Sequence, residues 1–131
     1  MTNKNISKNT TGWRRLPRAT YCSLQGYKAA WQFESGFRQY CILSLLLAPF
    51  SVFISSSTTQ CLLLISSLVL LLLAEIVNSA IEAVADAVSQ EYNELIGRAK
   101  DLGSAAVFTA LLLVILIWAV AIYEYVSVLL P

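Results

Sequence analysis

Long apolar runs, interrupted at a few places by polar residues, dominate the chain. No Asp, Glu, Lys or Arg occurs between Arg38 and Glu75. That interval is too long for one membrane span and contains the polar run 55–60, so it predicts two helices joined by a short loop. A third uncharged stretch, 102–123, is long enough to cross a hydrocarbon core about 30 Å thick at about 1.5 Å per residue. The pattern therefore predicts three spans, at about 39–54, 61–86 and 102–126.

A different pattern precedes the first span. Apolar side chains recur there at three- and four-residue intervals, and basic or amide side chains fall largely between them. This is typical of an amphipathic helix that lies in the membrane interface, with its aromatic rings at headgroup depth. We expect such a surface helix over about 13–33, and the pattern alone is equally consistent with simple anchoring. The apolar positions are Trp13, Leu16, Thr20, Leu24, Tyr27 and Trp31.

Composition agrees with the pattern and narrows the chemistry. With 57% hydrophobic and 13% charged residues, the chain is expected to be an all-α integral membrane protein with one membrane domain, 1–131. The net charge is only +1, so nucleic acid is not an expected partner. The chain contains no histidine, which excludes histidine acid–base chemistry, Ser-His-Asp triads and the usual zinc sites. Three cysteines without CxxC spacing are expected to be free thiols.

The distribution of basic residues predicts the orientation. Seven of the 9 Lys and Arg residues precede the first span, and the other two, Arg98 and Lys100, lie between the second and third. The loop at 55–60 has none. The positive-inside rule therefore predicts that the N-terminus and the second connection lie in the cytoplasm and that the C-terminus lies outside.

The second span carries a stripe of acids on an otherwise apolar helix. Glu75, Asn78, Glu82 and Asp86 fall within an arc of roughly 80° at about 100° per residue. Acids within a membrane are costly, and they indicate a functional site by default. Glu75 would lie deepest, with Glu82 and Asp86 approaching the cytoplasmic interface.

Carboxylates without histidine or thiolate suit Mg²⁺, which binds one or two carboxylates together with substrate phosphates. Lys100, expected just before the third helix, can meet a polyphosphate. Phosphoryl transfer needs positioning, a cationic clamp and a group that deprotonates the attacking hydroxyl, and all three residue types are present. The chain has neither GxxxxGK[ST] nor GxGxxG. The residues alone leave two other interpretations open: neutralising pairs within a structural bundle, or a pore or proton path.

At these residues the sequence resembles a known family. The segments TTGWRR, AAWQFESGFRQ, EIVNSAIEAVAD and EYNELIGRAKDLGSAAV are similar to those of the small bacterial integral-membrane diacylglycerol kinases. The resemblance runs over nearly the whole chain. It implies a homotrimeric helical bundle whose protomers each have a surface helix and three transmembrane helices, with composite sites at the cytoplasmic interface. It also implies phosphorylation of diacylglycerol by MgATP, with the surface helix as a lid over the lipid headgroup.

The resemblance implies a role for each matching residue. Glu75 would be the general base on the lipid hydroxyl, with Asn78 holding the local geometry. Glu34 and Glu82 would bind Mg²⁺ with the ATP phosphates, and Lys100 would contact the γ-phosphate. The positions implied for the nucleotide are Arg15, Cys22, Glu34, Glu82, Glu91, Tyr92, Asn93, Lys100 and Asp101. Those implied for the lipid are Arg15, Ala19, Ser23, Gly36, Arg38, Gln39, Glu75, Ser104 and Trp118.

Three positions depart from the family pattern. Tyr40 replaces an acidic residue that often follows FRQ, Cys22 stands where an aromatic is common, and Asn93 replaces a frequent histidine. These changes bear on lipid and adenine contacts rather than on phosphate chemistry. Related small membrane kinases phosphorylate undecaprenol, which is the nearest alternative substrate; the loop and N-terminal matches favour diacylglycerol. A catalytically inactive assembly or a proton-conducting bundle is the alternative of a different class.

Overall fold

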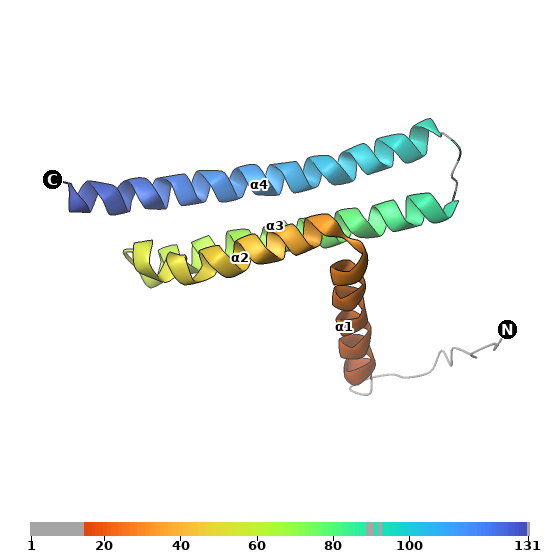
Figure 1. The fold of residues 1–131 in the computed structure, drawn as a ribbon, viewed down its shortest axis with the longest axis horizontal. Coiled ribbons are helices and arrows are strands. Elements are labelled where there is room, and N and C mark those ends of the chain that lie inside the picture. The colour runs from red at the N-terminus through yellow and green to blue at the C-terminus, as the bar shows by residue number, and fades with distance from the viewer. Residues whose placement is uncertain (1–14, 89–90, 92, 131) are drawn as a thin grey trace.

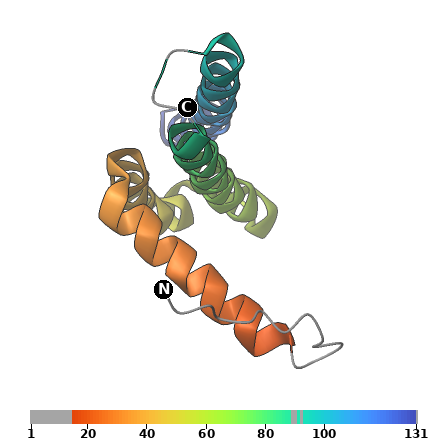
Figure 2. The ribbon, with the colours of Figure 1, turned by 90° about the vertical axis from the view of Figure 1, so that its right-hand side faces the viewer.

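The computed structural model of the chain describes residues 15–88, 91 and 93–130. This part contains four helices: α1 (Arg15–Phe33), α2 (Ser35–Ile54), α3 (Thr58–Val88) and α4 (Glu94–Leu129). The long helices α2, α3 and α4 run along one another as an elongated bundle, whereas α1 projects from it at a steep angle (Figures 1 and 2). The first two positions of the expected surface helix, 13 and 14, lie outside the described residues, as does Tyr92.

Three of these helices are long and apolar enough to cross a membrane, namely α2, α3 and α4. An all-α membrane architecture is therefore confirmed. Both α3, with 31 residues, and α4, with 36, exceed the roughly 20 residues that a span requires. The surplus allows the two helices to carry polar residues beyond the hydrocarbon core.

Helix α4 begins well before the uncharged stretch from which the third span was inferred. The side chain of Asn93 accepts hydrogen bonds from the backbone N–H groups of Leu95, at 2.9 Å, and Ile96, at 3.3 Å. This is an ordinary N-cap, and it starts the helix where the cap lies rather than where the charges end. The expectation that Lys100 precedes the third helix was therefore wrong: Lys100 lies on α4.

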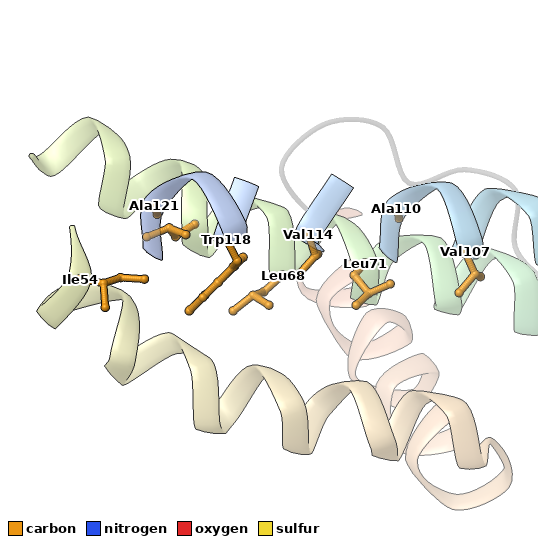
Figure 3. Close-up of a cluster of buried hydrophobic side chains, with 9 residues drawn as sticks. Ile54, Leu68, Leu71, Val107, Ala110, Val114, Trp118 and Ala121 are labelled. Carbon is orange, nitrogen blue, oxygen red and sulfur yellow. The ribbon is translucent and has the colours of Figure 1, made fainter. Parts of the chain in front are cut away.

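A narrow apolar core joins the three long helices. Helix α3 packs against α4 along its length and against α2 on another side. The buried side chains include Leu64 of α3. Figure 3 shows others of this core, among them Leu68 and Leu71 of α3, and Val114 and Trp118 of α4. Much of the remaining apolar surface is exposed, as expected for helices that face lipid or another protein chain.

Polar contacts close the bundle at the end away from the acids. The side chain of Gln60 donates to Glu124 Oε2 at 2.7 Å and thereby links α3 to α4. Its carbonyl oxygen accepts from the backbone and hydroxyl of Ser56, at 2.6 and 2.9 Å. The α2–α3 connection is thus bonded to α3 at Gln60, and Gln60 in turn links it to α4.

A single arginine secures the junction between α1 and α2. Arg38 donates to the carbonyl oxygens of Trp31, at 2.8 Å, and Gln32, at 3.2 Å. These carbonyls belong to the last turn of α1, where a helix has no backbone donors left for them. A cation there also interacts favourably with the helix dipole. Arg38 therefore stabilises the sharp change of direction between the two helices.

Candidate functional site

The buried polar residues at the site gather on the second half of α3. The side chains of Glu75 and Asn78 are 8% and 9% exposed, and that of Glu82 is half-buried. Asn78 Nδ2 donates to Glu82 Oε1 at 3.0 Å, one turn further along the helix. The acid stripe inferred from helical periodicity is thus buried at Glu75 and Asn78 and more exposed at Glu82, and the Asn78 amide orients the Glu82 carboxylate.

Glu75 lies against the start of α2. A Cβ at Gly36 would collide with Glu75 Oε1 and would lie 3.0 Å from Glu75 Cδ. The absence of a side chain at Gly36 is what lets the carboxylate approach the helix so closely. The carboxylates of Glu82 and Glu34 also lie near enough to act electrostatically on Glu75. The fold therefore gathers acids from α3 and from the α1–α2 junction.

On the other side of α3, Asn78 contacts α4 at a second glycine. A Cβ at Gly103 would collide with Asn78 Oδ1 and would lie 3.4 Å from Asn78 Cγ and from Ile81 Cδ1. Asn78 Oδ1 is buried and has no hydrogen-bond partner. Since Nδ2 is engaged by Glu82 and Oδ1 faces Gly103, the amide has one defined orientation.

Lys100 brings positive charge from α4 to the acids. Its ammonium forms an ion pair with Asp86 Oδ1 at 2.7 Å, across the connection between α3 and α4. The carboxylate of Glu82 lies within electrostatic range of the same ammonium. Both side chains of the ion pair are partly exposed, 39% for Lys100 and 69% for Asp86, so an anion from solution can reach the lysine.

The acids present are a suitable but incomplete set of ligands for a hard cation. Glu34 occupies the N-cap position of α2 and its side chain makes no capping hydrogen bond, so its carboxylate is available. Glu82 supplies the second carboxylate. Within residues 15–88, 91 and 93–130, no group of three or more acidic, His or Cys side chains is arranged to hold a metal ion. Two carboxylates completed by phosphate oxygens and water suit Mg²⁺.

The structure brings some predicted residues together and leaves others apart. Glu34, Gly36, Glu75, Asn78 and Glu82 converge, and Lys100 lies close to them. Ser23 of α1 lines a cavity with Leu73 and Ile76 of α3.

Elsewhere, Trp118 lies in the apolar core near Ile54, toward the end opposite the acids (Figure 3). Asn93 caps α4, and Arg38 binds the end of α1. Other predicted positions lie on the surface of the protomer: Arg15, Ala19, Cys22, Gln39, Asp101 and Ser104 are exposed on the helices, and Glu91 lies in the α3–α4 connection.

Sequence reasoning did not identify Gly103 and Ser79, which the fold places beside the acids. Gly103 contacts Asn78, and Ser79 is 8% exposed with a partnerless hydroxyl. The signal for Ser79 was present, because four residues after Glu75 a helix returns to within about 40° of the same face. No comparable signal marks Gly103, because its contact depends on how α4 is rotated against α3.

The sequence of this chain is similar to those of known proteins over most of its length. The family model of prokaryotic diacylglycerol kinase matches residues 21–122. A diacylglycerol kinase of Escherichia coli K12 is 41% identical over 120 residues, covering 92% of this chain and 98% of the relative. The diacylglycerol kinase of Haemophilus influenzae is 44% identical over 109 residues, covering 83% and 92%. That of Pseudomonas aeruginosa is 42% identical over 112 residues, covering 86% and 91%.

Proposed function

This chain belongs to the prokaryotic diacylglycerol kinase family, and we propose that it transfers the γ-phosphoryl group of ATP to the free hydroxyl of diacylglycerol, producing phosphatidic acid and ADP. It is a multi-pass membrane protein of a bacterial family. The observation that carries the proposal is the buried carboxylate of Glu75, held at the α2 terminus with two further carboxylates close by. Burying an acid within a membrane-spanning helix costs free energy, and such an acid by default indicates a functional site.

Glu75 acts as the general base. Its carboxylate accepts the proton of the lipid hydroxyl as that oxygen forms a bond to the γ-phosphorus of ATP. The bond between the γ-phosphorus and the oxygen bridging to the β-phosphate breaks in the same displacement, and the leaving oxygen stays on ADP. General base catalysis of this kind contributes about 10²–10⁴-fold to the rate.

The other acids and the lysine hold the phosphates. Glu34 and Glu82 would bind Mg²⁺, and Asn78 keeps the Glu82 carboxylate oriented through its hydrogen bond. When bound, the metal neutralises phosphate charge and orients the phosphoryl oxygens. Lys100 contacts the γ-phosphate by exchanging its exposed partner Asp86 for a phosphate oxygen. Such charge-assisted contacts are stronger than neutral hydrogen bonds.

Arg15, Glu91 and Asp101 complete nucleotide binding in this proposal, while Ser23, Arg38, Gln39, Ser104 and Trp118 border the lipid. Arg15, Gln39, Asp101 and Ser104 are exposed on the helices of one protomer. Their exposure supports composite sites in a homotrimer, in which side chains of neighbouring protomers complete each site. The concentration of basic residues before α2 and near the start of α4 supports a site on the cytoplasmic face of the inner membrane.

Phosphate transfer in mixed micelles tests this function. Purified protein with MgATP is given dioleoylglycerol or undecaprenol, and the labelled lipid product is measured. We expect transfer to dioleoylglycerol, and a loss of about 10²-fold or more in Glu75→Gln. Glu124→Gln is the matched control, since Glu124 lies at the opposite end of the bundle and the amide can still accept from Gln60.

Each result has a definite meaning. Preference for undecaprenol would change the assigned substrate and leave the phosphate chemistry intact. Absence of transfer to both lipids by folded protein would refute the kinase assignment and return the acids to a structural or proton-conducting role. Equal activity of the wild type and Glu75→Gln would remove Glu75 from the role of base.

A further inference from the structure

Ser79 is a buried hydroxyl on the same stretch of α3 as the acids, and it has no assigned task. The residue is 8% exposed and its Oγ has no hydrogen-bond partner. Ser51, Ser67 and Thr109 bond instead to a backbone carbonyl of the preceding turn. Ser44 of α2 also has a buried, partnerless hydroxyl, but Ser79 is the one that lies between Glu75 and Glu82 on α3. An unpaired buried hydroxyl costs free energy. Its persistence beside a site therefore points to a ligand that pairs with it.

The position of Ser79 along α3 defines what that ligand group is. Ser79 follows Glu75 by about 6 Å along the helix axis and precedes Glu82 by about 4.5 Å. At about 100° per residue it lies some 40° from Glu75 and 60° from Glu82 around the helix. Ser79 is thus on the turn between the carboxylate that faces the lipid hydroxyl and the carboxylate that faces the phosphates.

The environment of Ser79 leaves room for a ligand on one side. Between α1 and α3 there is a hollow of about 360 Å³, lined by Ser79 together with Glu34, Gly26, Ala30 and Ala80. Glycine and alanine residues line most of this space, Phe33 and Ile76 complete its apolar wall, and Glu34 supplies its acidic edge. Serine has three staggered χ1 rotamers, so the hydroxyl can turn toward a ligand without moving the helix.

We propose that Ser79 Oγ donates a hydrogen bond to the phosphoryl group during its transfer, and so acts as a further catalytic residue; the inference rests on the kinase function proposed above. The attacking oxygen must approach phosphorus to about 3–3.5 Å before reaction. The phosphorus therefore lies within one helical turn of the hydroxyl that Glu75 deprotonates, on the side toward Glu82. Ser79 is the residue with a hydroxyl at this position along α3, between Glu75 and Glu82.

The chemistry suits a hydroxyl donor. As the lipid oxygen bonds to phosphorus and the bond to the β-phosphate oxygen breaks, negative charge is spread over the three equatorial oxygens of the transferring group. A donor fixed at one of these oxygens stabilises the transition state more than the ground state. The serine keeps its proton throughout, because the proton of the lipid hydroxyl goes to Glu75.

Kinetics of four variants test the proposal. Ser79→Ala removes the donor, and Ser79→Thr and Ser79→Val form an isosteric pair that differs only in the hydroxyl. Ser67→Ala is the matched control, since Ser67 is also a buried serine on α3, and its hydroxyl is already bonded to the carbonyl of Leu64. Rates with MgATP and dioleoylglycerol are measured in mixed micelles.

We expect kcat to fall roughly 10²-fold in Ser79→Ala and Ser79→Val, the cost of removing one such donor. Both KM values should stay within about twofold, because the lost contact forms chiefly in the transition state. Ser79→Thr should retain most of the activity, and Ser67→Ala all of it. The ³¹P resonance of the γ-phosphate of a bound non-hydrolysable ATP analogue should shift between Ser79→Thr and Ser79→Val.

Wild-type rates in Ser79→Ala and Ser79→Val would overturn the proposal. A loss confined to a higher KM for dioleoylglycerol would overturn it too, since Ser79 would then contact the lipid. If Ser79→Ala does not fold, the Thr and Val pair decides the question at constant side-chain volume. Failure of the kinase function appears separately, as a wild-type protein that transfers no phosphate, and the ³¹P comparison still reports whether Ser79 meets the phosphate.

Discussion

At the residue scale, Gly103 shows how a position without a side chain constrains the site. An added methyl group would displace Asn78, whose amide orients Glu82. We expect overpacking in Gly103→Ala to lower the free energy of unfolding by about 1–3 kcal/mol. The higher helix propensity of alanine offsets about 1 kcal/mol of this loss. Kinase activity should fall more than about tenfold, because each 1.36 kcal/mol of lost transition-state stabilisation costs that factor. Denaturant unfolding in micelles and the transfer assay measure the two effects.

Gly97 provides the control on the same helix. A Cβ there has nothing within 4 Å, so Gly97→Ala gains helix propensity without a clash. This variant should be as stable as the wild type or up to about 1 kcal/mol more stable, with activity retained. Equal stability and activity of the two alanine variants would show that α4 shifts freely, and that Gly103 does not hold Asn78 in place.

At the element scale, the orientation of α1 depends on Arg38. Its guanidinium satisfies two carbonyls at the end of α1, and hydrogen bonds to a charged group are worth about 1.5–3 kcal/mol. We expect Arg38→Met to accelerate amide hydrogen exchange in the last turns of α1, while exchange in the core of α3 and α4 stays slow. Arg18 is an exposed arginine on α1 itself, so Arg18→Met should leave amide exchange in α1 near the wild-type rate. Unchanged exchange in Arg38→Met would mean that the junction is held by packing alone.

The helices differ in how far the sequence predicts them. Apolar runs identify α2, α3 and α4, because a helix needs about twenty predominantly apolar residues to cross a bilayer. The start of α4 could not be inferred from an uncharged run, since four of the eight residues in 94–101 are charged. The capping preference of Asn93 is the local signal that marks it. Charge therefore delimits the membrane-crossing part of a helix, whereas capping delimits the helix itself.

The candidate site divides in the same way. Glu75, Asn78 and Glu82 share a face of one helix, so periodicity alone predicts that they lie together. Their partners on other helices, Gly36 and Gly103, depend on the rotation of α2 and α4 about their axes. No local pattern encodes that rotation. It results from how the narrow core around Leu68 and Trp118 packs.

At the scale of the whole molecule, charge lies at one end of an apolar bundle. Basic residues precede α2 and recur near the start of α4, while the loop between α2 and α3 has none. Transferring that loop across the membrane costs less than transferring the basic segments, so the positive-inside rule puts the α2–α3 loop outside. The two ends of the bundle are therefore expected to face different compartments, with the acids on the cytoplasmic side.

Thiol labelling in spheroplasts tests this orientation. In a protein with Cys22, Cys41 and Cys61 replaced by alanine, single cysteines are introduced as Thr58→Cys and Glu94→Cys, both exposed first residues of their helices. A membrane-impermeant maleimide should label Thr58→Cys in intact spheroplasts and Glu94→Cys only after lysis. The converse result would mean that the protein has the opposite orientation, with Glu75, Glu82 and Lys100 toward the outer face. Equal labelling of both positions before lysis would indicate two orientations, which the charge asymmetry argues against, because reversing the chain would move most of its basic residues to the outer face.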